Sequence, residues 1–324
     1  MNNFKKIGLT ALAGSLVATS VYAGEMSVSG SASWRISNHA GTDGGKTMAM
    51  GNQLTFTGGG EMDNGMNVSL SFILDQGDDH PATAASTANN EARADSSPFD
   101  SHSITVSSDA MGSITFAGEG ASSAQNTIDT TAAGDIWDNT FSGYTKAGNA
   151  SASKTLLWTL PSMVDGLGVV TSYNMSTAGE EATIGYALTY TGVEGLSVSY
   201  GMGEVGDTTA GTGGREVTTM KASFAFGPVT AAMSINDYDI TGATANEEQS
   251  SYKVSYTISD ELSVSYGSET HETVGQTYDE EFEQISVSYT TGGLTASVSQ
   301  TDATNASAEG NEQEKWNVGL SFAF

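Results

Sequence analysis

The chain has 324 residues and carries 38 acidic side chains against 11 Lys and Arg, which gives a formal net charge of −27 at pH 7. This charge argues against nucleic acid as a partner, and the absence of cysteine excludes disulfide bonds. Only 38% of the residues are hydrophobic and 39 are glycine. Such a composition suits a loop-rich secreted β protein, a partly disordered chain, or a barrel whose strands face water on one side.

The first 23 residues have the features of a secretory signal peptide. Lys5 and Lys6 precede a short apolar stretch, residues 7–17, and Val21-Tyr22-Ala23 is a small-residue cleavage site. The apolar stretch is too short to span a bilayer as a helix. We therefore expect cleavage after Ala23, which leaves residues 24–324 as the mature chain and removes two lysines but no acidic residue.

From Met26 onward, apolar and small polar residues alternate, as in a strand with one apolar and one polar face. In the first such segment one side carries Met26, Val28, Trp34 and Ile36, and the other carries four serines and Arg35. Further segments are centred on residues 54–56, 68–72, 104–106, 114–116, 156–160, 167–173, 184–190 and 196–202. Three more pairs flank residues 227–228, 259–261 and 291–293, and a terminal segment brings the number of predicted strands to sixteen.

The connections between these strands alternate between tight turns and longer polar segments. Residues 63–65 and 109–112 are typical turns, whereas residues 76–99 and 120–153 are long and polar. Short periplasmic turns and long external loops are typical of outer-membrane barrels, and closure of the sheet satisfies every backbone hydrogen bond in lipid. The pattern predicts an all-β protein, a 16-stranded antiparallel transmembrane β-barrel with both ends on the periplasmic side.

The last twelve residues, 313–324, show the alternation most strongly. From Trp316 to Phe324 every second residue is large and apolar, and the residues between them are Asn317, Gly319, Ser321 and Ala323. A soluble edge strand with one dry face has the same period. The contrast in size between the two faces favours lipid on one side and a water-filled lumen on the other.

The ending Lys-Trp-Asn-Val-Gly-Leu-Ser-Phe-Ala-Phe resembles the C-terminal assembly signal of Gram-negative outer-membrane barrels. Together with the signal peptide and the sixteen strands, it makes the chain similar to the general trimeric porins, especially those of alphaproteobacterial type. The resemblance implies a homotrimer that contacts outer-membrane lipid and lipopolysaccharide, and that the barrel-assembly machinery recognises through Phe324. Family members associate through their first and last strands, and small residues on the outward face here, Gly30, Ala32 and Gly118, would permit close approach.

The resemblance also implies that the loop after the fifth strand, residues 120–153, folds inward to narrow the pore. It lacks the Pro-Glu-Phe-Gly-Gly-Asp stretch of enterobacterial porins, so its detailed conformation is expected to differ. The candidate acidic residues at the constriction are Glu119, Asp129, Asp135 and Asp138.

Strand parity places four basic residues on the lumen wall, because a cation on the lipid side costs about 2–4 kcal/mol at the midplane. These residues are Arg35, Lys221, Lys253 and Lys315. A basic wall that faces an acidic loop predicts a transverse field across the constriction, as in the porin family; the alternative is a set of scattered solubilising charges. Glu247 and Glu248 are expected in the external loop after the eleventh strand.

Other chemistry has little support in the sequence. The four histidines are far apart, in or beside predicted loops, and lack metal-ligand spacing. Residues 201–206 match a dinucleotide-binding pattern formally, but the residues that follow cannot open a helix. Asp75, Asp78 and Asp79 are weak candidates for Ca²⁺ binding, and a solvated acidic loop is the favoured interpretation. We therefore expect no enzymatic activity and no cofactor.

The leading hypothesis is an outer-membrane porin, a passive diffusion channel for small hydrophilic solutes and ions. The acidic excess predicts a preference for cations. The alternative is a structural or surface-recognition barrel with a plugged pore, whose loops serve as an adhesin or a phage receptor.

Overall fold

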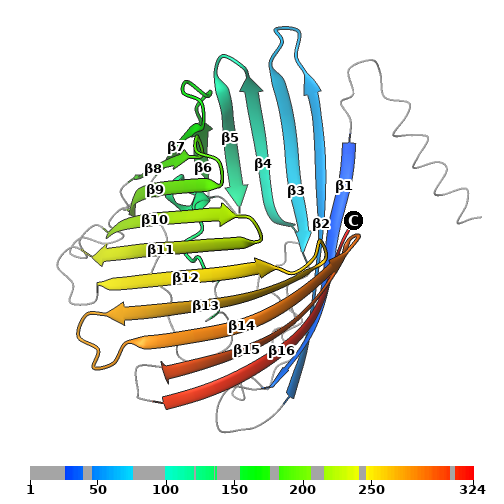
Figure 1. Cartoon of the computed structure of the whole chain (residues 1–324). Helices are drawn as coiled ribbons and strands as arrows, with labels where there is room; N and C mark the ends of the chain where they lie inside the picture. The colour runs from blue at the N-terminus through cyan, green and yellow to red at the C-terminus, as the bar shows by residue number, and fades with distance from the viewer. Residues whose placement is uncertain are drawn as a thin grey trace, which may run out of the picture.

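Sixteen strands form one closed antiparallel barrel, in which each strand pairs with its neighbours in sequence and β16 pairs with β1 (Figure 1). The computed structural model describes residues 26–38, 46–75, 99–119, 122–134, 136, 154–175, 182–205, 215–240, 246–306 and 311–324. The barrel confirms the predicted fold class and number of strands. The predicted signal peptide, residues 1–23, lies outside the described residues.

The strands are 5 to 16 residues long. The first eight are β1 (Met26–Asn38), β2 (Lys46–Glu61), β3 (Asn67–Asp75), β4 (Phe99–Ser108), β5 (Gly112–Glu119), β6 (Thr155–Thr159), β7 (Leu167–Asn174) and β8 (Thr183–Tyr190). The others are β9 (Leu196–Val205), β10 (Arg215–Phe226), β11 (Val229–Ile240), β12 (Glu247–Thr257), β13 (Leu262–Thr273), β14 (Glu280–Thr291), β15 (Leu294–Ala306) and β16 (Asn311–Ala323). A short 3-10 helix, η1 (Gln125–Thr127), lies between β5 and β6. Within the described ranges, no helix is both long and apolar enough to cross a membrane.

The tight turns predicted from the sequence all lie at one end of the barrel, the turn end. Only residues 227–228 separate β10 from β11, and only residues 292–293 separate β14 from β15. The C-terminus lies at this end, because the Ala323 amide donates to the Gly293 carbonyl and the Phe324 amide donates to the Gly30 carbonyl. The opposite end, the loop end, carries the longer connections.

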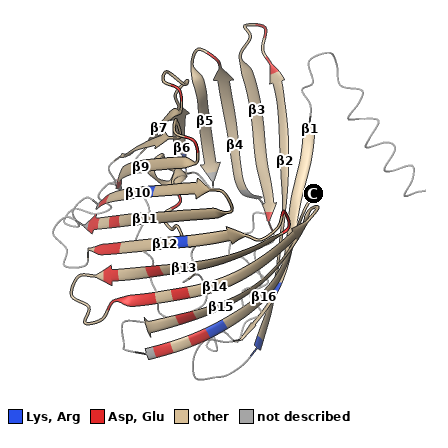
Figure 2. Cartoon of the chain, viewed as in Figure 1, with Lys and Arg blue, Asp and Glu red and all other residues tan. Residues whose placement is uncertain are grey.

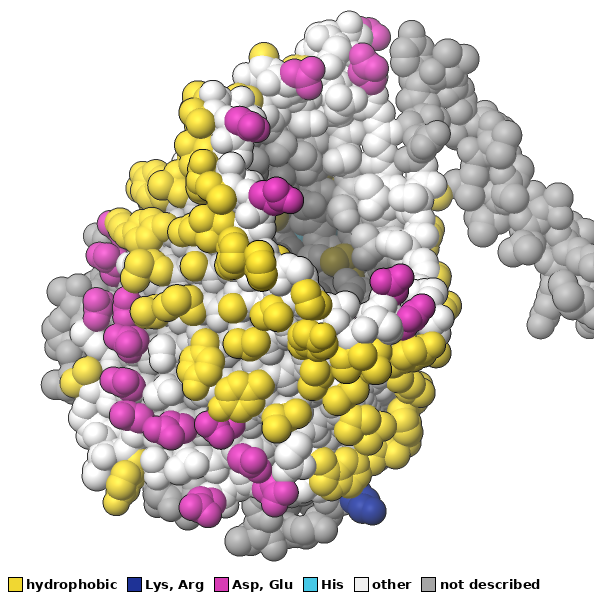
Figure 3. All heavy atoms as spheres, viewed as in Figure 1, with side chains coloured by type: hydrophobic (Ala, Val, Ile, Leu, Met, Phe, Trp, Pro, Cys, Tyr) yellow, Lys and Arg dark blue, Asp and Glu magenta, His cyan; other side chains and the backbone are white. Residues whose placement is uncertain are grey.

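The outer surface of the barrel is a band of exposed apolar side chains. Members from neighbouring strands, such as Tyr252, Val287, Val298 and Leu320, are 41–54% exposed, and Figure 3 shows the band in yellow across the visible face. The alternate residues face the lumen and are mostly serine, threonine and glycine. This arrangement matches a strand that has lipid on one side and water on the other.

A belt of outward-facing carboxylates borders the apolar band on its loop-end side, over strands β9 to β16 (Figures 2 and 3). Its members stand directly opposite one another on neighbouring strands; for example, Glu248 of β12 pairs with Asp237 of β11 and with Glu272 of β13. We call this set the outer acidic belt: Glu204, Glu216, Asp237, Asp239, Glu248, Glu272, Glu283, Asp302 and Glu314.

One expectation about residue placement was wrong, and so was one about free space on the outer face. Glu247 and Glu248 lie at the start of β12 and not in an external loop, so that Glu248 faces outward and Glu247 faces the lumen. The outward space beside Gly30 and Gly118 is filled within the chain. A Cβ placed on Gly30 would lie 2.6 Å from Cζ of Phe324, and one placed on Gly118 would clash with the His102 imidazole. These two glycines therefore accommodate side chains of their own barrel.

Candidate functional site

Residues 122–134, which we call the inner loop segment, lie inside the barrel and pack against the lumen side of β7 to β13. Helix η1 contacts β8, β9 and β10. The segment is largely buried, since Ala124 and Gln125 are inaccessible to solvent and Ile128 is 5% exposed. Its contacts are with residues that alternate with the exposed apolar ones, so it approaches the wall from within. This is the first part of the loop that the sequence predicts to fold inward.

The wall behind the inner loop segment has very small residues at its closest contacts with the segment. A Cβ placed on Gly201 of β9 would lie 2.9 Å from Cδ1 of Ile128, and one placed on Gly267 of β13 would lie 2.9 Å from Cβ of Ala133. Ala124 and Ile128 form an apolar cluster with Ala187 of β8. Larger side chains at these lumen-facing positions would fill the space that the segment occupies.

Hydrogen bonds from the wall fix the first half of the segment. The Ala124 amide donates to Oγ of Ser172 at 2.8 Å. The Gln125 side-chain amide donates to Oγ1 of Thr219 at 2.6 Å, and Thr219 in turn donates to Oδ1 of Asn236 at 2.6 Å. These polar groups are buried and do not contact water, so each of these hydrogen bonds supplies a partner within the protein.

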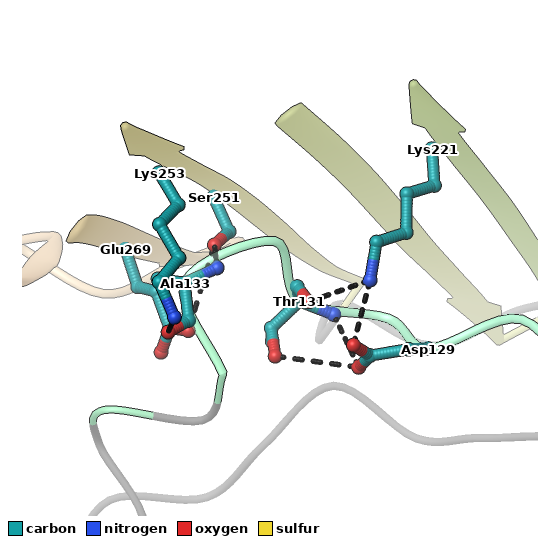
Figure 4. A network of polar contacts seen from close by, with 7 residues as sticks. All are labelled: Asp129, Thr131, Ala133, Lys221, Ser251, Lys253 and Glu269. Atoms are coloured by element: carbon teal, nitrogen blue, oxygen red, sulfur yellow. Dashed lines mark hydrogen bonds and ion pairs between the residues drawn. The ribbon is translucent and has the colours of Figure 1, made fainter. Parts of the chain in front are cut away.

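An ion pair holds the second half of the segment (Figure 4). Nζ of Lys221 lies 2.6 Å from Oδ2 of Asp129 and also donates to the Thr131 carbonyl at 3.0 Å. The other carboxylate oxygen, Oδ1 of Asp129, accepts the Thr131 amide at 3.1 Å. Both oxygens of Asp129 are therefore engaged within the protein.

A second lysine reaches the end of the segment. Nζ of Lys253 donates to the Ala133 carbonyl at 3.5 Å, and the Ala133 amide donates to Oγ of Ser251 at 2.8 Å. The Ser251 hydroxyl donates to Oε1 of Glu269, which is 1% exposed, at 3.5 Å. Figure 4 shows both lysines extending from the wall toward the segment. Ala133 is thus held at its amide and at its carbonyl.

The structure brings some of the predicted site residues together and leaves others apart. Asp129 meets Lys221, and Lys253 meets the loop backbone, but both lysines stand on the wall against which the segment lies and not across the lumen from it. Arg35 of β1 and Lys315 of β16 belong to the lumen side of a different sector, where β1 pairs with β16. Glu119 is the last residue of β5, and its backbone pairs with His102. Asp135 and Asp138 lie outside the described residues.

The candidate calcium ligands are not gathered into a described site. Asp75 ends β3, and Asp78 and Asp79 fall outside the described ranges. Among the residues that the structure describes, no group of three or more His, Asp or Glu side chains is arranged to hold a metal ion.

Sequence reasoning missed a polar cluster on the lumen face of β12 to β14. Nδ1 of His271 lies 3.3 Å from Oε2 of Glu280, and its Nε2 lies 3.8 Å from Oε2 of Glu247. His271 is 4% exposed and belongs to β13, and not to a loop. The sequence did indicate this position, because His271 and Glu269 are alternate residues of one strand and therefore share a face.

Comparison with known proteins agrees with this architecture. Residues 8–324 match the family model described as Gram-negative porin. No curated protein sequence matches the chain.

Several solved porins have a similar fold. An anion-selective porin from Comamonas acidovorans superimposes with a TM-score of 0.68 at 12% identity, covering 93% of this chain and 100% of that one. A mutant of the Rh. blastica porin gives 0.65 at 15% identity with the same coverage. A loop-deletion mutant of OmpT, an outer-membrane protein of Vibrio cholerae, gives 0.65 at 12% identity and covers 93% and 99%. The chain therefore belongs to the Gram-negative porin family and is an outer-membrane β-barrel channel protein.

Proposed function

We propose that the protein is a passive diffusion channel for small hydrophilic solutes and ions, that it prefers cations, and that it carries out no catalysis. The observation that supports this most directly is the character of the lumen face. Strand β1 presents a row of serines and Arg35 to the lumen, while its outward face is apolar. Hydroxyl groups both donate and accept hydrogen bonds, so they can replace part of the hydration shell of a passing solute without selecting one chemical type.

The preference for cations is supported by carboxylates on the lumen side of the wall, in a chain of net charge −27. Asp75 and Glu247 lie on lumen-facing strand positions, and so do Glu269 and Glu280, which are 1% and 6% exposed. A narrow aqueous path through a low-dielectric wall focuses the field of such groups on ions in transit. The Comamonas porin is named as anion-selective, but at 12% identity it resembles this chain in fold alone.

The test is a planar bilayer measurement on purified protein. We expect discrete single-channel conductance steps and, in a salt gradient, a reversal potential of the sign that denotes cation passage. A reversal potential of the opposite sign would reject the cation preference and leave the channel intact. A folded barrel that inserts but carries no current would support the alternative of a surface-recognition barrel with a plugged pore.

We further propose that the chain assembles as a homotrimer, as porin family members generally do. The outward face of β1 carries no charged side chain, in contrast to the outer acidic belt of β9 to β16. The apolar side chains of that face and the exposed Ala32 are suited to packing between barrels. Native mass measurement in detergent should give three times the mass of one chain, and a monomer alone would remove this part of the proposal.

A further inference from the structure

We propose that Lys221 and Lys253 are positioning residues that clamp the inner loop segment onto the wall of β7 to β13, and that the charge of Asp129 serves this clamp. The effect of this clamp on transport rests on the proposed function, because the position of the segment sets the width of the path left for solutes. It differs from a transverse field, in which basic residues face the acidic loop from across the lumen.

The geometry around Lys221 supports the clamp. Its ammonium group has three donor hydrogens, and two acceptors from the segment, Oδ2 of Asp129 and the Thr131 carbonyl, lie at 2.6 and 3.0 Å. The Asp129 carboxylate also accepts the Thr131 amide. The two opposite charges are in contact, so at the distance of a passing ion their fields largely cancel. Asp129 therefore contributes less to selectivity than an unpaired carboxylate at the same position.

A similar arrangement surrounds Lys253, which bonds Ala133, four residues after Asp129 in the segment. Lys253 and Ser251 are alternate residues of β12, so they share the lumen face. One bonds the Ala133 carbonyl and the other bonds its amide. Ser251 is itself connected to the buried Glu269 of β13. Strand β12 thereby holds a single residue of the segment, and β13 supports this contact through Glu269.

The small wall residues explain why the clamp needs lysines. Among the described residues, the apolar cluster that the segment forms with the wall involves Ala124 and Ile128 near its start. Near its end, the neighbour of Ala133 is Gly267, which provides no side chain. Polar contacts from the two lysines and from Ser251 thus hold residues 129–133, where the buried side chains Ala132 and Ala133 are small.

The placement of the segment can be tested without any current measurement, because the chain contains no cysteine. A Cβ on Gly267 would lie 2.9 Å from that of Ala133, shorter than the roughly 3.8 Å of a disulfide, so the segment must move slightly away from the wall for the bond to form. We expect the double variant Ala133→Cys/Gly267→Cys to cross-link under mild oxidation in the folded, detergent-solubilised protein, with a mobility shift on a non-reducing denaturing gel. The matched control is Ala133→Cys/Gly319→Cys, which places the second cysteine on β16, three strands from β13, and should not cross-link.

The role of the lysines is tested by the rate of that cross-link. Adding Lys221→Met and Lys253→Met should slow cross-linking and raise both the mean single-channel conductance and the current noise. Lys221→Arg and Lys253→Arg keep the charge and the donors, and should restore the original behaviour.

The possible results separate the proposals. Failure of the Ala133/Gly267 pair to cross-link in a folded barrel, or equal cross-linking of the control pair, would overturn the placement of the segment. A cross-linking rate that is unchanged by the methionine variants would overturn the clamp. A barrel that cross-links as expected but never conducts would leave the clamp standing and reject the channel function.

Discussion

The C-terminal residue Phe324 closes the barrel on Gly30. The Gly30 amide donates to the Phe324 carbonyl at 2.9 Å, the Phe324 amide donates to the Gly30 carbonyl at 3.0 Å, and the Phe324 ring covers the outward side of Gly30. The ring also stacks on Phe322, with centroids 5.8 Å apart. The pair joins the first and last strands at the turn end, where the chain has no covalent connection to hold them.

We predict that Gly30→Val destabilises the closure. A Cβ at this position would lie 2.6 Å from the Phe324 ring and 2.8 Å from Leu54, so both side chains must move. Both contacts are with the ends of exposed side chains, so the expected cost is about 1 kcal/mol, at the lower end of the range for overpacked sites. It would be measured as a lower temperature of the heat-induced mobility change on gels. Ala32→Val is the matched control, since Ala32 also faces outward on β1 but is exposed, and it should leave that temperature nearly unchanged.

The variant Phe324→Ala tests whether Phe324 acts by stabilising the closure or as the predicted assembly signal. If Phe324 acts mainly as a signal, the purified variant should refold in detergent almost as well as the parent chain while its assembly in cells falls. A loss of refolding in detergent equal to the loss in cells would show that the ring acts through packing alone.

The outer acidic belt predicts a stabilising substitution. Glu248 stands between Asp237 and Glu272 on neighbouring strands, and like charges that face each other directly are destabilising by roughly 0.2–1 kcal/mol for each pair. Glu248→Gln should therefore raise the heat-modification temperature at low salt. The gain should shrink at high ionic strength, because salt screens exposed charges. A gain that persists unchanged in high salt would assign it to something other than repulsion.

The sequence predicts the barrel well because its main signal is local. Within the apolar band, residues such as Tyr252 and Val254 alternate with lumen-facing residues, so strand identity and facing follow from parity. Alternation no longer indicates which way a residue faces where a strand extends beyond the apolar band at the loop end. At the start of β12, Glu247 and Glu248 are both acidic although one faces the lumen and the other faces outward, and alternation cannot separate two polar faces.

The position of the inner loop segment is harder to predict because its contacts join distant parts of the chain. Ala133 and Ser251 are 118 residues apart, and Asp129 and Lys221 are 92 apart. Parity correctly places the two lysines on lumen-facing positions, but it contains no information on which wall the segment approaches. Lumen-facing glycines such as Gly201 and Gly267 are the signal that sequence reasoning left unused, since they mark where another part of the chain comes close.

We predict that larger residues at Gly201 displace the segment in a graded way. A Cβ there would lie 2.9 Å from Ile128 and 3.2 Å from Cα of Gln125, so alanine already requires a small shift and leucine a large one. The series Gly201→Ala, Gly201→Val and Gly201→Leu should change single-channel conductance progressively and slow the Ala133/Gly267 cross-link in the same order. Gly168→Leu is a control, because the nearest atom to its Cβ position is the Thr189 carbonyl at 3.8 Å. An equal response to Gly168→Leu would contradict a specific contact at Gly201.

The last prediction compares two adjacent residues that face opposite sides of the wall. Glu247 is a lumen-facing residue near His271, whereas Glu248 belongs to the outer acidic belt. A carboxylate in the lumen acts on ions in a confined aqueous path, and one on the outer face is separated from that path by the barrel wall and is screened by salt over a length of about 8 Å. Glu247→Gln, alone or with Glu280→Gln, should therefore lower the cation-to-anion permeability ratio obtained from the reversal potential.

Glu248→Gln removes the same charge one residue away and should leave that ratio unchanged at moderate salt. Equal shifts from Glu247→Gln and Glu248→Gln would mean that the net charge of the loop end, and not the lumen face of β12, determines selectivity.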